Sequence, residues 1–425
     1  MNTSIYDELK WRGMIHDQID GVEKLLSEKK VTLYNGFDPT ADSLHVGHMV
    51  PLIALARFQR YGHHVLALAG GGTCMIGDPS GRSSERNLLS REEVLHNVEC
   101  IKKQLAHFLD FDVKANPAKI VNNMDWLGGL SMLDFLRDTG KYFTINYMMA
   151  KDSVKTRLDR ESGLSFTEFS YMLLQSYDFL HLHKEMGCEL QCGGSDQWGN
   201  ITAGSDLIRK VTGDAVFGLT YPLIKKSDGT KFGKTAGGAV WLDPKRTSPY
   251  KFYQFWLNTD DNDVIHYLKF FTFFDEEKIN GLEAETKEHP EARAAQKALA
   301  LEMTRMMHGE TAVANAQQAS QALFGGDIIG LSAEDIHDIF SEVPSFDMPA
   351  DHFGGEGINV VDVLTGTGFL KSKGEARRGI QEGGIYVNNR RVTDAAMNVT
   401  ISDFIGGKYL ILRRGKKNYF MVKAI

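Results

Sequence analysis

The sequence lacks the features that direct a chain into a membrane or a secretory pathway. No hydrophobic run is long enough to span a bilayer, and the N-terminal residues do not have the basic-then-apolar layout of a signal peptide. Only four cysteines occur in 425 residues, too few for a disulfide framework, and Cys188 and Cys192 have no second pair at zinc-binding spacing. We therefore expect a cytoplasmic protein with free thiols and no metal site of its own.

Three common nucleotide-binding motifs are also missing. No G-x-G-x-x-G follows the first predicted strand, and the run Gly70-Gly71-Gly72 fails that spacing, which argues against a dinucleotide-dependent dehydrogenase. The segment 77–83 (GDPSGRS) is one residue short of a P-loop and has Arg in place of Lys. A kinase glycine-rich loop and an H-R-D set are missing too, so any nucleotide site in this chain must be of another kind.

What the sequence does contain is an uneven distribution of charge. The formal net charge is −7, but residues 358–425 hold 12 Lys/Arg against 5 Asp/Glu, a balance of +7. The other 357 residues therefore carry −14. A basic end on an acidic body indicates that this end contacts a polyanion, although charge alone is equally compatible with a solvated basic surface.

The first half of the chain alternates strand-like and helix-like patterns. This alternation predicts an α/β fold with a doubly wound, mainly parallel, Rossmann-like sheet, whose ligands bind at the carboxyl ends of the strands. The predicted strands are Val31–Gly36, His64–Leu68, Lys119–Asn122, Cys188–Cys192 and Val216–Ile224, and the predicted helices are 46–61, 91–109, 146–159, 166–182 and 196–211.

The alternating region at 1–247 is expected to be a catalytic domain, and composition divides the rest of the chain into three further parts. The helical pattern at 248–324 predicts a helical domain. Residues 325–357 are irregular and predict a linker with a short helix at 333–341, and the basic segment 358–425 predicts a small α+β domain.

The most informative segment is the strand–turn–helix junction at 31–48. The strand ends at Gly36, Pro39 marks a turn, and a helix-periodic run then begins with His45 and His48 in its first turn. A helix start offers unpaired N–H groups and a partial positive charge, and two imidazoles add donors for an anion. The pattern H-x-G-H is typical of nucleotidyl transfer, while two isolated histidines near a helix cap would only be solvated.

Three other segments point to the same kind of site. The polar loop 225–235 carries lysines and glycines, which suits a mobile clamp on a polyphosphate, or else a solvated loop. Tyr171, Gln175 and Asp178 share one helix face, which either binds a small zwitterionic or hydroxylated ligand or forms a polar outer surface. A strand end at 193–200 (GGSDQWGN) opens another helix, where Asp196 either contacts a ribose or caps the helix.

Taken together, these motifs closely resemble those of the bacterial tyrosyl-tRNA synthetases, a family of class I aminoacyl-tRNA synthetases. Residues 39–48 resemble the HIGH signature with Val46 in place of Ile, and residues 231–235 resemble the KMSKS signature with Phe232 and Gly233 in place of Met and Ser. The end of the chain, with KSKGEARR at 371–378 and GGIYVN at 383–388, resembles the S4-type RNA-binding fold. The resemblance covers essentially the whole chain.

The resemblance implies a role for each matching residue. Tyr34 and Asp178 bind the phenol of the substrate tyrosine, and Gln197 lies near its carboxylate. The ammonium group is held by Asp78, Tyr171 and Gln175. The remaining assignments are Thr40, His45, His48, Lys231 and Lys234 at the ATP phosphates, Asp38, Gly47, Gly194 and Asp196 at the nucleotide and ribose, Arg82 and Arg86 in a basic loop, and Lys371, Lys373, Arg377, Arg378, Arg413 and Arg414 on tRNA.

The activity implied is that of a tyrosine–tRNA ligase. L-tyrosine and ATP form tyrosyl-adenylate and pyrophosphate, and the tyrosyl group then passes to the 3′ end of tRNA(Tyr). ATP is a substrate accompanied by Mg²⁺, no tightly bound cofactor and no membrane partner are expected, and the family implies a homodimer. Two alternatives remain open, a tryptophanyl-type class I synthetase and a non-catalytic RNA-binding or splicing factor with the same fold.

Overall fold

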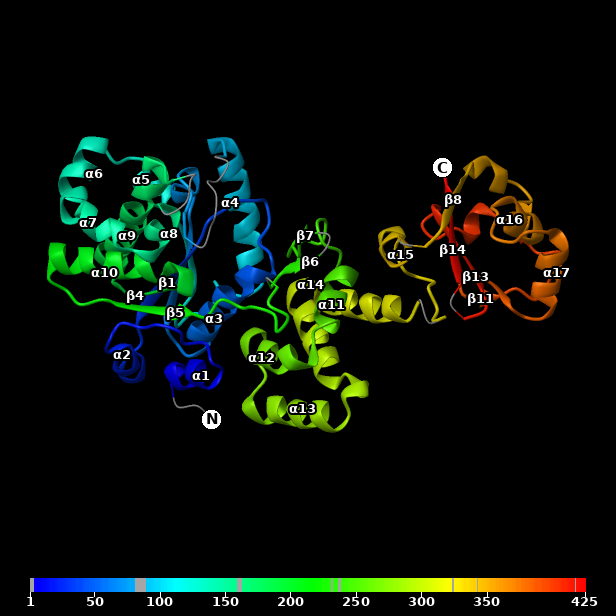
Figure 1. Ribbon diagram of the computed structural model, residues 1–425, viewed down its shortest axis with the longest axis horizontal. Helices are drawn as coiled ribbons and strands as arrows, with labels where there is room; N and C mark the ends of the chain where they lie inside the picture. The colour runs from blue at the N-terminus through cyan, green and yellow to red at the C-terminus, as the bar shows by residue number, and fades with distance from the viewer. Residues whose placement is uncertain are drawn as a thin grey trace. The chain divides into compact units, whose positions relative to one another are not determined.

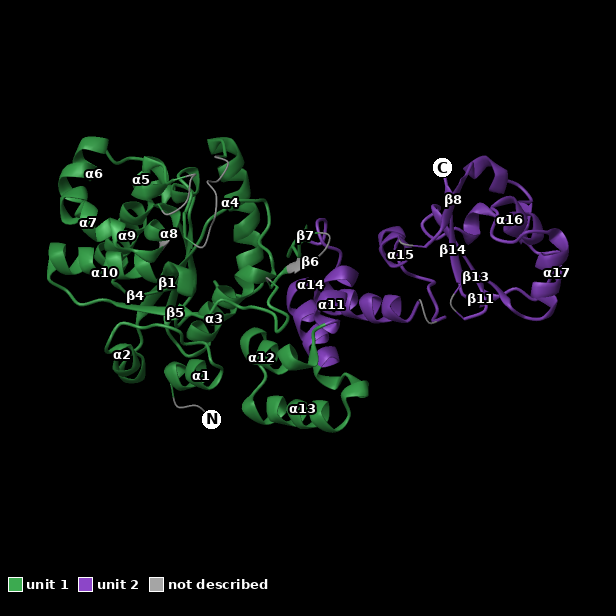
Figure 2. Cartoon of the chain, viewed as in Figure 1, with its two compact units in different colours: residues 1–243, 259–295 green, residues 244–258, 296–425 purple. Residues whose placement is uncertain are grey.

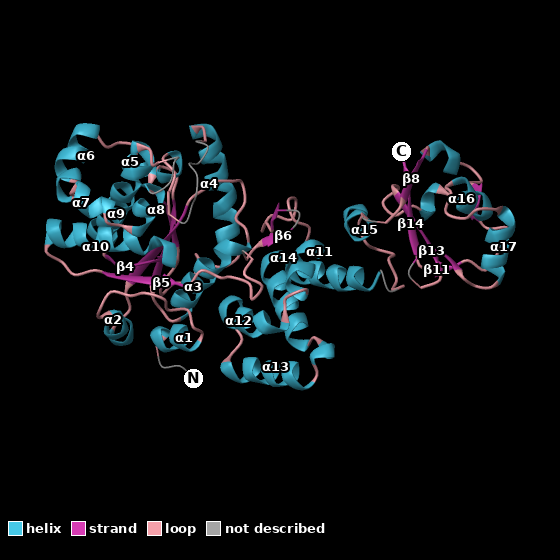
Figure 3. Cartoon of the chain, viewed as in Figure 1, coloured by secondary structure: helices cyan, strands magenta, loops and turns pink. Residues whose placement is uncertain are grey.

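A computed structural model of the chain describes residues 4–80, 89–158, 163–230, 232–235, 238–322, 325–341, 343–416 and 418–425. The chain forms two compact units, residues 1–243 with 259–295 and residues 244–258 with 296–425 (Figure 2). Each unit has its own sheet, as the secondary-structure colouring makes clear (Figure 3). The domain boundaries expected from composition remain a prediction.

The first unit is built on a five-stranded sheet in the order β3-β2-β1-β4-β5. Strands β1, β4 and β5 of this sheet are labelled in Figure 1. All four strand pairs are parallel, which confirms the doubly wound α/β architecture expected from the alternating pattern. Its central strand β1 is buried on both faces, as a sheet between helical layers requires. The strands are β1 Thr32–Phe37, β2 His64–Ala69, β3 Lys119–Asn122, β4 Cys188–Gly194 and β5 Phe217–Tyr221.

Helices connect and cover these strands. The longest of them in the first unit, α9, begins at the N-cap Ser165, whose hydroxyl accepts from the Glu168 N–H, and ends at Gly187 with φ 63°. Helices α9 and α10 pack on the sheet around a core that includes Tyr34, Leu66 and Phe179. The first-unit helices up to this point are α1 Ile5–Trp11, α2 Val22–Glu28, α3 Met49–Arg60, α4 Arg91–Leu105, α5 Met124–Leu127, α6 Met132–Asp138, α7 Ile145–Met149, α8 Asp152–Leu158, α9 Phe166–Met186 and α10 Trp198–Thr212.

One predicted helix is interrupted. The periodic pattern at 146–159 forms two short helices, α7 and α8, with a break at Ala150 and Lys151. The Lys151 ammonium donates to the Thr202 hydroxyl at 3.0 Å and lies 4.4 Å from the centre of the Tyr147 ring. These tertiary contacts accompany a turn that sequence periodicity does not reveal.

The predicted helical stretch after residue 248 is helical in the structure. Helices α12 and α13 belong to the first unit, whereas α11 and nearly all of α14 belong to the second. Gly309 interrupts α14 with φ 81° and ψ 176°. The four helices are α11 Pro249–Leu257, α12 Asp261–Phe271, α13 Glu276–Glu288 and α14 Ala294–Ala322.

The second unit ends in a mixed five-stranded sheet, in the order β11-β10-β13-β14-β8. The predicted short helix at 333–341 is confirmed as α15 Ala333–Phe340, but the predicted linker is not wholly irregular, because Ser345–Met348 forms β8 and pairs in parallel with β14. Proline on both sides of this four-residue strand, at 344 and 349, hides it from pattern analysis. The other elements are β9 Ile358–Asn359, α16 Val360–Gly366, α17 Lys373–Gln381, β10 Ile385–Val387, β11 Arg390–Arg391, β12 Asn398–Val399, β13 Tyr409–Arg414 and β14 Asn418–Ala424.

Among the helices that the structure describes, none is both long and apolar enough to cross a bilayer. All four cysteines are free thiols.

Candidate active site

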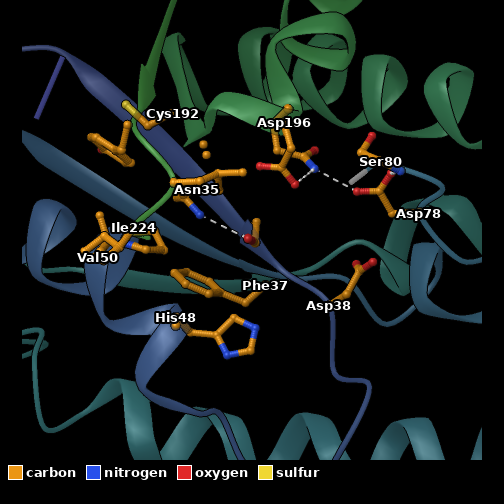
Figure 4. Close-up of a pocket in the computed structure, with 18 of the residues that line it drawn as sticks. Asn35, Phe37, Asp38, His48, Val50, Asp78, Ser80, Cys192, Asp196 and Ile224 are labelled. Atoms are coloured by element: carbon orange, nitrogen blue, oxygen red, sulfur yellow. Dashed lines mark hydrogen bonds between the residues drawn. The ribbon is translucent and has the colours of Figure 1, made fainter. Parts of the chain in front are cut away.

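A cavity of about 720 Å³ opens at the carboxyl ends of β1 and β4, in the first unit (Figure 4). The rule for open α/β sheets places ligands at this edge. Thirteen of the predicted tyrosine and ATP residues line it: Tyr34, Asp38, Thr40, His45, Gly47, His48, Asp78, Tyr171, Gln175, Asp178, Gly194, Asp196 and Gln197.

One end of the cavity is formed by the predicted strand–turn–helix junction. A short 3-10 turn, Val46–His48, leads directly into α3. The Nδ1 atom of His45 accepts from the Gly47 N–H at 3.0 Å, and the Nδ1 atom of His48 accepts from the His45 N–H at 3.2 Å. Because both Nδ1 atoms accept, the proton of each neutral imidazole is assigned to Nε2. Both rings are therefore donors through Nε2 without needing a positive charge.

The opposite end of the cavity is buried and holds a carboxylate. Asp178 is 2% exposed, and its two oxygens accept from the Asn123 amide at 2.9 Å and the Trp126 indole N–H at 2.7 Å. Burial raises the pKa of Asp178 to about 7, although those two hydrogen bonds act in the opposite direction. Tyr34 is 1% exposed, and its hydroxyl has no hydrogen-bond partner among the described residues. A buried polar atom in this state is suited to a partner from a ligand.

The face of α9 meets the cavity as its spacing predicts. The Tyr171 hydroxyl donates to Asp38 at 3.0 Å, and burial raises the pKa of Tyr171, so the phenol keeps its proton. Since that proton is committed to Asp38, the Tyr171 oxygen can act towards a ligand as an acceptor. The Gln175 side-chain oxygen, which accepts from Asn200 at 2.9 Å, also lines the cavity. The polar stripe is therefore not an outer surface.

A third group of side chains comes from the end of β4 and the segment before residue 80. The Gln197 amide donates to Asp78 at 2.8 Å and to Asp196 at 3.4 Å, as the dashed lines in Figure 4 show. Burial raises the pKa of Asp196, and the charge of Asp78 adds to that shift. One amide thus joins two carboxylates that lie far apart in the sequence.

The two signature segments are connected through the backbone. The Val46 N–H donates to the Val240 carbonyl at 2.9 Å, and the Val240 N–H donates to the Gly233 carbonyl at 3.1 Å. Gly233 has φ 80°, and a Cβ there would lie 3.0 Å from the Val46 side chain, so glycine allows this close approach. Phe232 stacks on Phe271 of α12 with ring centroids 5.3 Å apart.

Four of the predicted phosphate-binding residues fall in parts of the chain that the structure does not describe in full. Arg82, Arg86 and Lys231 lie outside the described residues, as does the side chain of Lys234. Within the described ranges, no three His, Cys, Asp or Glu side chains come together as a metal site would require.

Both parts of the chain match known family models. Residues 26–325 match the class I tRNA synthetases for tryptophan and tyrosine, and residues 335–422 match a C-terminal domain characteristic of tyrosine–tRNA ligases. The chain belongs to the tyrosyl-tRNA synthetases. It is 56% identical over 423 residues to the tyrosine–tRNA ligase of Roseiflexus castenholzii, and this alignment covers 100% of both chains. The Geobacillus stearothermophilus enzyme is 54% identical over 419 residues, 98% of each chain.

Solved structures agree with this assignment. A C-terminally truncated mitochondrial tyrosyl-tRNA synthetase of Aspergillus nidulans is 34% identical and superposes with a TM-score of 0.69, covering 76% of this chain and 95% of that one.

Sequence reasoning missed three residues that line or support this synthetase's cavity. Asn123 and Trp126, which hold Asp178, follow the predicted strand β3, and Thr73 follows β2. The signal available was their position at the carboxyl ends of parallel strands, where ligands bind.

The basic C-terminal residues of the synthetase differ in their surroundings. Arg377 and Arg378 on α17 are exposed, and neither forms an ion pair with a residue that the structure describes. Lys371 is exposed as well, whereas Lys373 and Arg414 pair with Asp362 at 2.5 Å and Glu375 at 2.6 Å.

Arg413 differs from these exposed basic residues because it is buried. It is only 7% exposed, and its guanidinium lies 3.7 Å from the centre of the Tyr386 ring and donates to Asn389 at 2.9 Å. These contacts favour a structural role for this one arginine.

Proposed function

We propose that the cavity activates L-tyrosine with ATP and that the enzyme then transfers the tyrosyl group to tRNA(Tyr). The observation that carries this proposal is the pairing of Tyr34 and Asp178 at the buried end of the cavity. A phenol placed there donates to the Asp178 carboxylate and accepts from the Tyr34 hydroxyl, which otherwise has no partner among the described residues. An indole has no oxygen with which to satisfy Tyr34, which disfavours tryptophan.

The amino group of tyrosine then faces acceptors. Tyr171 contributes its oxygen, since its proton is held by Asp38, and Gln175 and Asp78 contribute oxygens of their own. Three acceptors around one ammonium group give both orientation and charge compensation. Tyrosine bound at both ends directs its carboxylate towards the start of α3.

The first step needs no general base, because the tyrosine carboxylate is already a nucleophile. One carboxylate oxygen attacks the α-phosphorus of ATP, the bond to the β-phosphate bridging oxygen breaks, and pyrophosphate leaves with its Mg²⁺. Positioning and stabilisation of phosphate charge therefore provide the catalysis. Thr40, His45 and His48 are donors for that charge at a helix start.

The remaining assignments follow the family resemblance. Asp38, Gly47, Gly194 and Asp196 bind the nucleotide and its ribose, and Lys231, Lys234, Arg82 and Arg86 supply positive charge to the phosphates. Mg²⁺ enters with ATP, held by phosphates and water. In the second step a ribose hydroxyl at the 3′ end of tRNA attacks the activated carbonyl, and AMP leaves. We place this reaction in the cytoplasm.

The tRNA body contacts the basic C-terminal segment in this proposal. Exposed Lys371, Arg377 and Arg378 suit phosphate contacts, with Lys373 and Arg414 nearby. Arg413 contributes indirectly, by holding Tyr386 and the turn at Asn389.

The homodimer implied by the family has a candidate interface in the first unit. Large apolar side chains are exposed on α6, α7 and the start of α9, including Leu133 at 78%, Ile145 at 59% and Phe166 at 74%. Large apolar side chains that are this exposed are suited to burial against a second copy. Sedimentation of Phe166→Asp beside the unmodified protein tests it, because a charge there should produce monomers.

ATP–pyrophosphate exchange measured with each of the twenty amino acids tests the central proposal. Exchange that depends on L-tyrosine supports it. Preferential exchange with tryptophan would favour the tryptophanyl alternative, and no exchange with any amino acid would favour a non-catalytic RNA-binding protein.

A further inference from the structure

The glycine run Gly70-Gly71-Gly72 lies at the carboxyl end of β2, where nucleotide-binding loops often occur, yet side chains of the protein fill the space beside it. A Cβ on Gly70 would overlap the Asp38 carboxylate and lie 2.6 Å from the Thr73 hydroxyl. A Cβ on Gly71 would overlap the Asn122 side chain. The run therefore makes room for the protein's own polar groups, rather than for a phosphate.

Asn123 lies beside the third glycine, Gly72, and its hydrogen bonds fix the orientation of its amide. Its oxygen accepts from the Gly72 N–H at 2.7 Å, so its amide nitrogen must face the other way. That nitrogen donates to Asp178 at 2.9 Å and to the Thr73 hydroxyl at 2.9 Å. Asn123 is 0% exposed, and these three hydrogen bonds join its side chain to residues that the structure describes.

Thr73 continues the chain of hydrogen bonds towards the other end of the substrate. Its hydroxyl accepts from Asn123 and donates to Asp38 at 3.0 Å, and Asp38 also accepts from Tyr171. Every donor and acceptor has one consistent direction, because a carboxylate can only accept. The connected path runs from the phenol end (Asp178) through Asn123 and Thr73 to the ammonium end (Asp38 and Tyr171).

We propose that Thr73 is a positioning residue that joins the two ends of the tyrosine subsite into one unit, with Gly70 providing its space. This inference rests on the proposed function, because it assigns the two ends to the phenol and the ammonium of tyrosine. Thr73 is 2% exposed and does not itself have to touch the substrate. It acts through Asn123 on the residue that reads the phenol and through Asp38 on the residue that accepts from the ammonium.

Thr73→Val tests this proposal, since it keeps the shape and removes the hydroxyl. Asn123 then loses an acceptor and Asp38 a donor, so KM for tyrosine in the exchange reaction should rise about 5- to 150-fold, as expected when a buried polar partner is lost. The ratio of kcat/KM for tyrosine to that for phenylalanine should fall as well. Thr73→Ser restores the hydroxyl and should remain within about threefold of the unmodified enzyme.

Thr220→Val provides a matched control. Thr220 is 0% exposed in the same unit, and its hydroxyl accepts from the Asp17 N–H at 3.0 Å away from the cavity. This variant should lower the melting temperature without changing KM for tyrosine. If Thr73→Val does the same, the role of Thr73 is only structural and the proposal is wrong. If Thr73→Val does not fold, the same comparison is made with Thr73→Ala.

A double-mutant cycle distinguishes the coupling from two separate defects. Asn123→Ala and Tyr171→Phe affect the two ends, and in the presence of Thr73 their effects on KM for tyrosine should be non-multiplicative by about threefold or more. In the Thr73→Val background the effects should multiply. Equal coupling in both backgrounds would overturn the proposal, whereas an unmodified enzyme that shows no tyrosine-dependent exchange would instead refute the proposed function.

Discussion

The two ends of the cavity are built in opposite ways. At the end proposed to bind tyrosine (the tyrosine end), Tyr34 and Asp178 are 1% and 2% exposed, and Asp178 already accepts hydrogen bonds from two neighbours. At the end proposed to bind the ATP phosphates (the phosphate end), Thr40 and Gly47 are exposed, and the donors are arranged along a helix start. Recognition of a hydroxyl requires fixed, dry partners, whereas a charged polyphosphate is bound by donors that remain open to its approach.

The largest effect expected from this difference is on the choice of amino acid. Phenylalanine would leave the buried Tyr34 and Asp178 without their ligand partner, so kcat/KM for exchange should be lower than for tyrosine by roughly 10⁴–10⁵, a figure for which tyrosyl-tRNA synthetases are themselves the standard example. Exchange kinetics measured with each amino acid, in preparations that contain none of the other, give this ratio. A ratio below about 10² would mean that the buried end does not read the hydroxyl.

A large effect of another kind is expected at the phosphate end. His48→Ala removes a hydrogen-bond donor to the developing phosphate charge. It should raise the barrier to adenylate formation by about 2–4 kcal/mol, which slows this step roughly 30- to 1,000-fold, with little change in tyrosine affinity. Single-turnover kinetics separate the two parameters. Because Nδ1 of His48 accepts from the His45 N–H, the ring is left to donate through Nε2, a role that an amide can share. His48→Gln should therefore recover part of the rate, and an equal loss in both variants would contradict that role.

The same difference explains which residues could be predicted from sequence. The donors at the start of α3 lie within residues 38–48, so one local pattern, a strand end followed by H-x-G-H, was enough to predict a phosphate site there. The tyrosine end brings together β1, α5, α9 and the turn after β2. Of these elements, only α9 could be recognised from the sequence pattern as a candidate binding face, through the spacing of Tyr171, Gln175 and Asp178. Asn123 and Thr73 depend on contacts between distant segments, which periodicity does not encode.

The fold shows the same limit. The parallel sheet could be predicted because its strands are buried, apolar and separated by periodic helices. Strand β8 could not, because its four residues are mostly exposed and are held by pairing with β14. The consequence is practical, since a truncation near Gly357 would leave β8 without its partner strand.

A third prediction uses pH to distinguish the two ends. Asp178 has a pKa of about 7, so the carboxylate forms as pH rises through 7, and the protonated form predominates below it. A phenol donates best to the ionised form, so the affinity for tyrosine without ATP should be about tenfold higher at pH 8 than at pH 6. Equilibrium dialysis measures this without contributions from the phosphate end. Asp178→Asn should bind weakly at both values, and a tenfold change that persists in this variant would assign the titration to another group.

The smallest effect is expected in the second unit, at the exposed basic residues of α17. Replacing both Arg377 and Arg378 with Gln should weaken tRNA binding several-fold at physiological salt and leave tyrosine-dependent exchange unchanged. Each lost phosphate contact makes the dependence of log K on log salt shallower by about 0.7–0.9, so the slope for the double variant should be shallower by about 1.5.

The control is Lys24→Gln, which removes an exposed charge on α2 in the other unit and should not change the slope. Arg413→Gln should instead lower the melting temperature, because its buried guanidinium holds Tyr386 and Asn389. An unchanged salt dependence in the Arg377/Arg378 variant would place the tRNA contacts elsewhere, while the activation chemistry of the cavity would stand unaffected.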